Sequence, residues 1–274
     1  MTLSFAAFHL AGFLVFLFLF IVLTQNLQVF PGALLSLPIK ISRPKPPRGV
    51  ESIFIRAGRR ELDVWRMPPA AGEVRPRAAV VFHGNGGWLK HFVFPQLWFS
   101  ALGITSYGFD YRGFGRSSGW PSEQGIYQDG EAVCRYVLER EGLTPEQLII
   151  LGISVGGAPA ARAASRLDPK LLVLVAAFTS LPDVVRAKPF FRLFSRFLWY
   201  TLPTSSYIKA LRSANLLIAH GENDRIIPPS HSRELEKAYR GTGAVRRITA
   251  PAAGHNAVFY ALRSELARLL IELS

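Results

Sequence analysis

Short apolar runs alternate with helix-forming segments from residue 50 to the end of this 274-residue chain. After a strand pair expected over residues 51–57 and 61–67, strands are expected at residues 78–82, 104–111, 147–153, 171–178, 216–219 and 245–249. Short runs without polar–apolar alternation are typical of strands buried on both faces. Helices are expected between and after them, over residues 123–141, 158–166, 232–239 and 257–272. This alternation predicts an α/β fold with a mostly parallel central sheet and helices on both faces.

The first 39 residues contain no Asp, Glu, Lys or Arg, and residues 5–23 are apolar except for His9. Nineteen helical residues extend roughly 28 Å, close to the ~30 Å thickness of a bilayer's hydrocarbon core. We therefore expect an uncleaved transmembrane helix within residues 1–30. The alternatives are a cleaved signal peptide, which normally begins with basic residues, and a helix buried in a soluble domain.

Basic residues follow this apolar stretch, and none precedes it. Residues 31–49 combine four Lys or Arg residues with four prolines between positions 38 and 47, which predicts a semi-rigid linker. The positive-inside rule then places residues 50–274 in the cytoplasm. The net charge of +13 fits an anionic membrane surface. Because no nucleic-acid-binding motif accompanies the charge, no nucleic acid partner is expected.

The segment Gly152-Ile153-Ser154-Val155-Gly156 matches the pattern G-x-S-x-G. The pattern alone is weak, but here a buried strand comes directly before it and an Ala-rich helix directly after it. A strand–turn–helix of this kind holds the serine at the apex of a sharp turn, with glycines where a Cβ would clash. The following helix N-terminus favours developing negative charge. Ser154 is therefore the candidate nucleophile.

A serine nucleophile needs a histidine base, and that base needs an acid to orient it. After a nucleophile turn of this type the chain order is nucleophile, acid, histidine. His255 lies in a glycine-containing loop before the last helix, whereas His231 begins a helix and is expected to face solvent. Asp224 follows the strand before that loop, with Glu222 as the alternative acid. We therefore expect Asp224 and His255 to act with Ser154.

The oxyanion of an acyl-transfer reaction needs two backbone N–H donors. Val155, the residue after the nucleophile, is expected to supply one. The second is expected from the loop His83-Gly84-Asn85-Gly86-Gly87, at either Asn85 or Gly86, because the glycines there permit close approach of the backbone.

Several motifs follow one another in a recognisable order: residues 83–87, 110–119, 121–123, 152–157, 221–228 and 254–256. With them the chain resembles, over about residues 50–274, the α/β-hydrolase superfamily, and in particular its small membrane-anchored serine hydrolases. The resemblance implies hydrolysis of esters, thioesters or amides by Ser154, Asp224 and His255. It also implies structural roles for Asp110, Arg112 and Asp129.

The resemblance implies that no cofactor takes part. Cys134 is the only cysteine, and no histidine pair has the helical spacing of zinc ligands, so no metal site is expected either.

Residues 181–212 lie between two predicted strands, where a hydrolase of this superfamily carries its cap. The segment holds six basic residues against Asp183 alone, and its aromatic residues are Phe190, Phe191, Phe194, Phe197, Trp199 and Tyr200. We expect this basic and aromatic surface to lie on a bilayer; the alternative is a cap packed on the core of its own domain.

Together these features predict a membrane-anchored serine hydrolase that cleaves acyl esters or thioesters through an acyl-enzyme, with a lipid-like substrate. One alternative is a non-catalytic binding protein on the same fold. Another is a serine aminopeptidase-like enzyme, which needs an acidic group for the ammonium of its substrate; the basic cap disfavours it.

Overall fold

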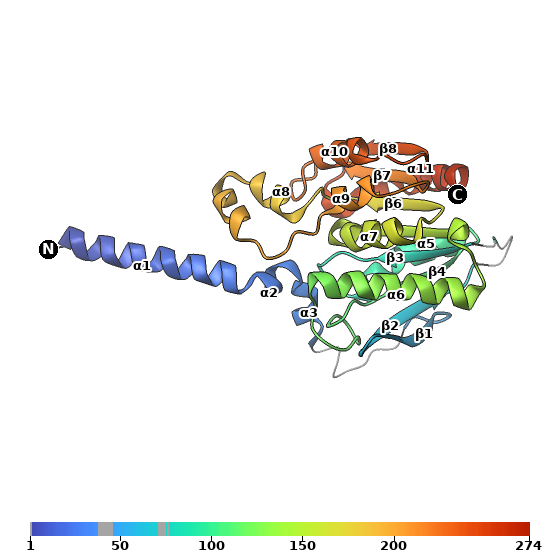
Figure 1. Ribbon diagram of the computed structural model, residues 1–274, viewed down its shortest axis with the longest axis horizontal. Helices are drawn as coiled ribbons and strands as arrows, with labels where there is room; N and C mark the ends of the chain where they lie inside the picture. Colours follow the sequence, from blue (N-terminus) through green and yellow to red (C-terminus); the bar gives the residue numbers. More distant parts are fainter. Residues whose placement is uncertain (1, 38–45, 71–74, 76) are drawn as a thin grey trace.

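The computed structural model describes residues 2–37, 46–70, 75 and 77–274 (Figure 1). They form an eight-stranded sheet in the order β1-β2-β4-β3-β5-β6-β7-β8. The strands are β1 (Glu51–Ala57), β2 (Arg60–Met67), β3 (Ala78–Phe82), β4 (Thr105–Phe109), β5 (Leu148–Ile153), β6 (Leu171–Val175), β7 (Asn215–Gly221) and β8 (Val245–Ala250). Only β2 runs antiparallel to its neighbours β1 and β4, and the remaining pairs are parallel. The predicted mostly parallel sheet is confirmed.

Helices cover both faces of this sheet. The helices of the described domain are α5 (Val93–Ala101), α6 (Glu123–Glu141), α7 (Gly157–Leu167), α8 (Leu181–Arg186), α9 (Thr204–Lys209), α10 (Ser230–Ala238) and α11 (Val258–Leu273). Single-turn 3₁₀ segments are η1 (Leu89–Phe92), η2 (Pro145–Gln147), η3 (Ser154–Gly156), η4 (Pro189–Phe191), η5 (Leu193–Phe197) and η6 (His255–Ala257). Helices α5 and α11 pack on one face, and α6, α7, α9 and α10 contribute to the core on the other.

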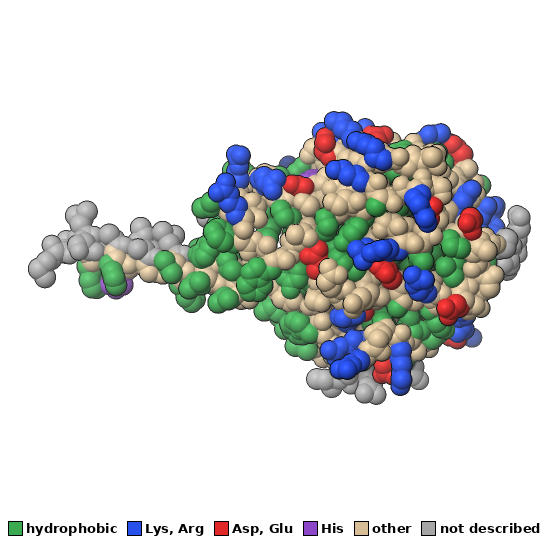
Figure 2. Space-filling view, viewed as in Figure 1, with side chains coloured by type: hydrophobic (Ala, Val, Ile, Leu, Met, Phe, Trp, Pro, Cys, Tyr) green, Lys and Arg blue, Asp and Glu red, His purple; other side chains and the backbone are tan. Residues whose placement is uncertain are grey.

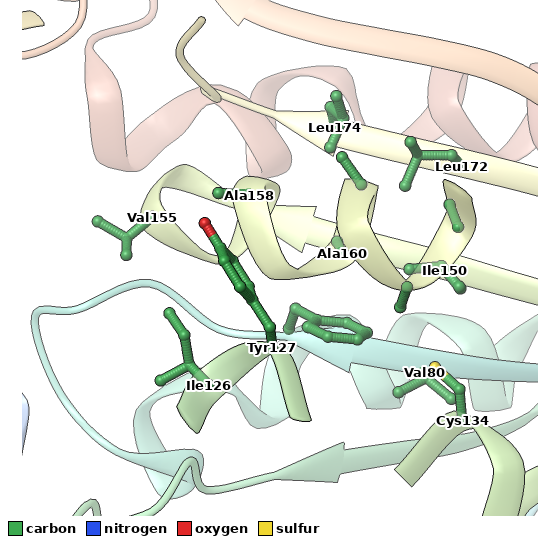
Figure 3. Close-up of a cluster of buried hydrophobic side chains, with 14 of the residues drawn as sticks. Val80, Ile126, Tyr127, Cys134, Ile150, Val155, Ala158, Ala160, Leu172 and Leu174 are labelled. Atoms are coloured by element: carbon green, nitrogen blue, oxygen red, sulfur yellow. The ribbon is translucent and has the colours of Figure 1, made fainter. Parts of the chain in front are cut away.

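Alternate residues of each central strand enter different cores, which explains why the strands are continuously apolar. In β5, Leu148 and Ile150 pack toward α6 and α7, whereas Ile149 and Leu151 pack toward α5 and α11. Figure 3 shows the first of these cores, where the small side chains of α7 lie close to Ile150 and to the neighbouring strand β6. Alanines on α7 allow that close approach, which positions the N-terminal end of α7 at the edge of the sheet.

The N-terminal region consists of α1 (Thr2–Leu23), α2 (Gln25–Val29) and α3 (Pro31–Leu35). Figure 1 shows α1 projecting away from the domain, with α2 and α3 at its base. Phe30 and Ala33 are each 1% exposed and belong to the main hydrophobic core. Residues 31–35, expected to begin a linker, are therefore helical and packed on the domain. Residues 38–45 of the expected linker lie outside the described residues.

The transmembrane helix predicted within residues 1–30 is not found. Among the residues that the structure describes, no helix is both long enough and apolar enough to cross a membrane.

Replacing Phe30 by alanine is expected to lower the free energy of unfolding by about 3 kcal/mol, because truncating a buried phenylalanine leaves a cavity. The matched control is Phe16→Ala in the same N-terminal region, since Phe16 is 63% exposed. Its effect should stay below about 0.5 kcal/mol. Urea unfolding followed by tryptophan fluorescence measures both variants. Equal effects would show that α2 and α3 do not form part of the cooperative core.

Candidate active site

Ser154 occupies a strained turn between β5 and α7. Its φ is 53°, a left-handed conformation that non-glycine residues rarely adopt. A Cβ on Gly152 would lie 2.7 Å from the Cβ of Ala160, and a Cβ on Gly156 would lie 2.3 Å from the carbonyl oxygen of Phe82. The neighbouring chain therefore tolerates only glycine on both sides of the serine. This is the strand–turn–helix that the G-x-S-x-G pattern predicts, and it lifts Ser154 to the carboxyl edge of the sheet.

The structure brings Ser154, Asp224 and His255 together although they come from three different loops. The Nε2 atom of His255 lies 3.0 Å from the Oγ atom of Ser154, and its Nδ1 atom lies 2.7 Å from the Oδ2 atom of Asp224. A carboxylate can only accept, so Nδ1 carries the ring proton and Nε2 accepts from the serine hydroxyl. This arrangement can remove a proton from Ser154 during nucleophilic attack.

Asp224 is held as a carboxylate by several donors. Burial alone would raise its pKa, but hydrogen bonds from His220 and His255 and from the backbone N–H of Ile227 hold the pKa of Asp224 well below its usual value. The backbone N–H of Ile226 also donates to it, at 2.9 Å. An ionised Asp224 can stabilise an imidazolium form of His255.

The two alternative residues weighed from the sequence lie elsewhere. Glu222 is exposed, so it does not take the place of Asp224. His231 is 6% exposed rather than facing solvent, and its ring contacts Thr179 from the start of α10. His220 was not expected at the site. His220 lies near the end of β7, and its Nε2 atom is 3.4 Å from the Oδ2 atom of Asp224. Its position four residues before Asp224 is the sequence feature that could have indicated this contact.

The glycine-rich loop after β3 lies directly against the nucleophile. A Cβ on Gly84 would be 3.6 Å from the Cβ of Ser154, and Gly84, Asn85 and Gly86 line the same pocket as Ser154 and Val155. Leu89, just beyond this loop, donates its backbone N–H to the buried Asp110 at 2.7 Å. Asp110 therefore has the structural role implied by the resemblance.

Arg112 and Asp129 form a second buried support. The guanidinium of Arg112 contacts Asp129 at 2.7 Å, and its backbone N–H donates to the same carboxylate at 2.8 Å. This pair ties the loop after β4 to helix α6, away from the reacting atoms. Its role is likewise structural, as the resemblance implies.

The N-terminal region holds the same glycine-rich loop from the other side. The Nδ2 atom of Asn85 donates to the carbonyl of Val29 at 3.0 Å, and the backbone N–H of Gly32 donates to the carbonyl of Asn85 at 3.0 Å. A Cβ on Gly32 would lie 2.5 Å from the carbonyl oxygen of Gly87, so this contact also requires glycine. No sequence motif pairs residues 29–32 with residue 85, and sequence reasoning missed the contact.

These contacts fix the direction of one backbone donor. A trans peptide unit is planar, and its N–H points opposite to its C=O. The carbonyl of Asn85 accepts a hydrogen bond from the N–H of Gly32. The N–H of Gly86, which belongs to the same peptide unit, therefore points away from Gly32.

The pocket at Ser154 has a volume of about 630 Å³ and is mainly apolar. Its apolar wall is made of Phe92, Phe94, Pro95, Ile153, Val155, Val175, Phe178, Leu181, Val184, Ile226, Ile227 and Phe259. Among the described residues that line it there is no Asp, Glu, Lys or Arg. The part of the chain that the structure describes also contains no cluster of His, Cys, Asp and Glu residues able to hold a metal ion.

The sheet order, the strained serine turn and the Ser–His–Asp contacts define the class of an α/β serine hydrolase. Comparison with known families agrees: residues 74–215 match the family model described as "Serine aminopeptidase, S33". The chain belongs to this family of α/β-hydrolases.

Individual relatives extend over most of the chain. An uncharacterized protein of Mycobacterium tuberculosis is 29% identical over 232 residues, which cover 85% of this chain and 80% of the relative. Among solved structures, an alpha-beta hydrolase from Vibrio vulnificus superposes with a TM-score of 0.71 and 17% identity over 91% of this chain and 92% of its own. Est1E from Butyrivibrio proteoclasticus, solved with ferulic acid, gives a TM-score of 0.67 and 17% identity over 81% and 98%. At these identities the solved structures support the fold.

Replacing Asp224 by asparagine is expected to change stability in a pH-dependent way. The folded pKa of Asp224 lies below the unfolded value of about 4, so its ionisation stabilises the folded state above that pH. This contribution is lost as the pH falls from about 4 toward the folded pKa. The difference in unfolding free energy between the parent and Asp224→Asn should therefore be constant near neutral pH and shrink below about pH 4.

Urea unfolding at pH 7, 5, 4 and 3 measures this difference. Glu222→Gln, which removes an exposed carboxylate two residues away, is the control and should show a much smaller change with pH. A parent–variant difference for Asp224→Asn that stays constant down to pH 3 would contradict the assignment of Asp224 as a stabilised carboxylate.

Proposed function

We propose that the protein hydrolyses acyl esters or thioesters through a covalent acyl-enzyme at Ser154. His255 takes the proton of Ser154 as Oγ attacks the carbonyl carbon, and then gives that proton to the departing alcohol or thiol. Water enters, His255 takes a proton from it, and the acyl group leaves as a carboxylic acid. The observation that carries the proposal is the continuous hydrogen-bonded chain from Asp224 through His255 to Ser154, at the wall of an apolar pocket.

In this proposal two backbone N–H groups donate hydrogen bonds to the oxyanion of the tetrahedral intermediate. The N–H of Val155 is one, because Val155 follows the nucleophile within η3, directly before α7. The second comes from the loop at Asn85 and Gly86. Gly86 is the better supported of the two, since the hydrogen bond between Gly32 and the carbonyl of Asn85 fixes the direction of its N–H.

The pocket favours an acyl group over an aminoacyl group. A substrate with a free N-terminal ammonium needs a carboxylate in the binding site, because a buried unpaired charge is costly. The described pocket residues provide none, and they offer aromatic and aliphatic side chains instead. This difference supports an esterase-type activity rather than an aminopeptidase activity within the family.

A lipid-like substrate is supported by an apolar surface on α1 and on the cap, whose helix α8 also lines the pocket. Phe18 of α1 packs on Phe194 and Phe197 of the cap, with ring centroids 5.8 and 4.9 Å apart. Exposed apolar side chains continue on both elements: Phe16, Leu19, Phe20, Leu23, Phe191, Leu193, Phe197 and Trp199. Figure 2 shows these two elements as neighbouring hydrophobic areas at one end of the molecule.

Contiguous exposed apolar surface of this kind commonly marks a membrane or protein contact. We infer that α1 and the cap contact a bilayer surface from which the acyl substrate enters.

Replacing Ser154 by alanine should reduce turnover of p-nitrophenyl butyrate by roughly 10³-fold or more, because the nucleophile is removed. Ser165→Ala on the following helix α7 is the matched control, since the hydroxyl of Ser165 donates to the carbonyl of Arg162 and does not line the pocket. Steady-state kinetics on both variants and on the parent measure the effect. Parent-level turnover by Ser154→Ala would refute the assignment, and faster parent hydrolysis of aminoacyl p-nitroanilides than of the ester would favour an aminopeptidase.

A fluorophosphonate probe separates the enzyme from a non-catalytic binding protein on the same fold. The probe should label Ser154 in the folded parent, because the His255 base activates that hydroxyl. Mass spectrometry of the labelled peptide identifies the modified serine. Absence of labelling in folded protein would favour the binding protein.

Replacing Gly32 by alanine should lower kcat by about 10²-fold with little change in KM, because the added methyl displaces the loop that carries an oxyanion donor. Gly12→Ala is the matched control, since a Cβ on Gly12 meets nothing within 4 Å. Kinetics on p-nitrophenyl butyrate at a temperature well below unfolding give the two constants. If Gly32→Ala keeps the parent kcat, the N-terminal region does not position the oxyanion loop.

A further inference from the structure

A second hollow, of about 740 Å³, lies across helix α8 from the catalytic pocket. This second hollow is lined by Asp183, Arg186 and Ala187. The catalytic pocket is lined by Leu181 and Val184 of the same helix. The opposite wall is formed by α10. We refer to this hollow, between α8 on one side and α9 and α10 on the other, as the basic groove.

Positive charge dominates the basic groove. Its basic residues are Arg186, Arg192, Lys209, Lys237 and Arg240, and its acidic residues are Asp183 and Glu234. Two ion pairs use both acids: Arg186 with Asp183 at 3.1 Å, and Lys237 with Glu234 at 3.2 Å.

The other three cations, Arg192, Lys209 and Arg240, have no acidic partner within the described part of the chain. Figure 2 shows Lys and Arg side chains gathered over α8 and α10, with few acidic ones between them. A concave wall with this excess of positive charge attracts an anion.

A buried histidine also lines the groove. The side chain of His231 is only 6% exposed, and the backbone N–H of Thr179 lies 3.3 Å from its Nδ1 atom. The Oγ1 atom of Thr179 lies closer to the same Nδ1 atom, at 2.9 Å, and its hydroxyl donates to Asp183 at 2.8 Å. Burial lowers the pKa of His231, which keeps the ring neutral near pH 7. The Nε2 atom has no hydrogen-bond partner among the residues that the structure describes, although His231 lines the groove.

We propose that the basic groove binds a phosphoryl group. Guanidinium groups match phosphate oxygens with paired donors, and lysine adds a point charge. The ligand is the phosphate of a lipid headgroup or of a small soluble phosphate ester, since both present the same oxygens. The inference is independent of the proposed hydrolysis, because no basic residue of the groove lines the pocket at Ser154.

A lipid source fits the surroundings of the groove. Arg192 lies between the exposed side chains of Phe191 and Leu193 on the cap. Basic side chains flanked by aromatic and aliphatic ones suit the boundary between headgroups and acyl chains. The groove would then hold a headgroup while α1 and the cap contact the same lipid layer.

The test compares the parent with the double variant Arg192→Gln/Lys209→Gln. Arg135→Gln/Arg166→Gln is the matched control, because it removes the same charge from exposed arginines that do not line the groove. Isothermal titration at low salt measures binding of inorganic phosphate and of glycerol 1-phosphate. Co-sedimentation measures binding to phosphatidylglycerol vesicles, with phosphatidylcholine vesicles alongside. Turnover of p-nitrophenyl butyrate by both double variants reports that they are folded.

The groove variant should bind about tenfold more weakly than the parent to at least one of the phosphate probes, while the control keeps parent affinity. Binding should also weaken as salt rises. Groove-dependent binding to phosphatidylglycerol vesicles without binding of the soluble phosphates identifies a lipid headgroup, and the reverse identifies a soluble ligand. Equal losses in the two double variants, or no binding of any phosphate probe by the parent, would overturn the proposal.

Discussion

The left-handed backbone at Ser154 is the constraint on which the active site depends. A residue at φ 53° costs free energy, so its surroundings must hold it in place. Three contacts do so: the buried strand β5 before it, the alanine-rich helix α7 after it, and the end of β3 beside Gly156. The alanines of α7 and the two flanking glycines make these approaches possible. The conformation of the nucleophile therefore depends on the packing of the core around the parallel sheet.

Much of this could be predicted because the relevant signals are local. The strand before Ser154, the glycines around it and the loop positions of Asp224 and His255 are all visible within short windows of sequence. Contacts between distant segments carry no such signal. The sequence of residues 25–35 does not indicate that Phe30 packs in the core or that Gly32 is hydrogen-bonded to Asn85. A buried helix and a membrane helix have the same apolar composition, so composition does not distinguish them. The burial of His231 was missed for the same reason, since Thr179 lies 52 residues away.

Helix α8 separates two environments of opposite character. On one side, aliphatic residues of α8 face an apolar pocket that excludes charged side chains among its described lining. On the other, its polar residues face a groove with a surplus of cations. A six-residue helix suffices for this, because residues three positions apart, such as Leu181 and Val184, share one side of it. One side of α8 therefore suits an apolar chain, and its other side suits an anionic group.

The packing of α2 and α3 also affects how the hydrolase domain can be prepared. A fragment that begins at residue 50, where β1 is about to start, would retain every residue of the Ser–His–Asp chain. It would nevertheless lose the hydrogen bonds that join Asn85 to Val29 and Gly32. It would also lose the ring of Phe30, which packs on Phe114 and Tyr200. Such a fragment could give a low measured rate although its catalytic residues are intact. In this protein the boundary of the functional unit lies nearer the N-terminus than the boundary of the sheet.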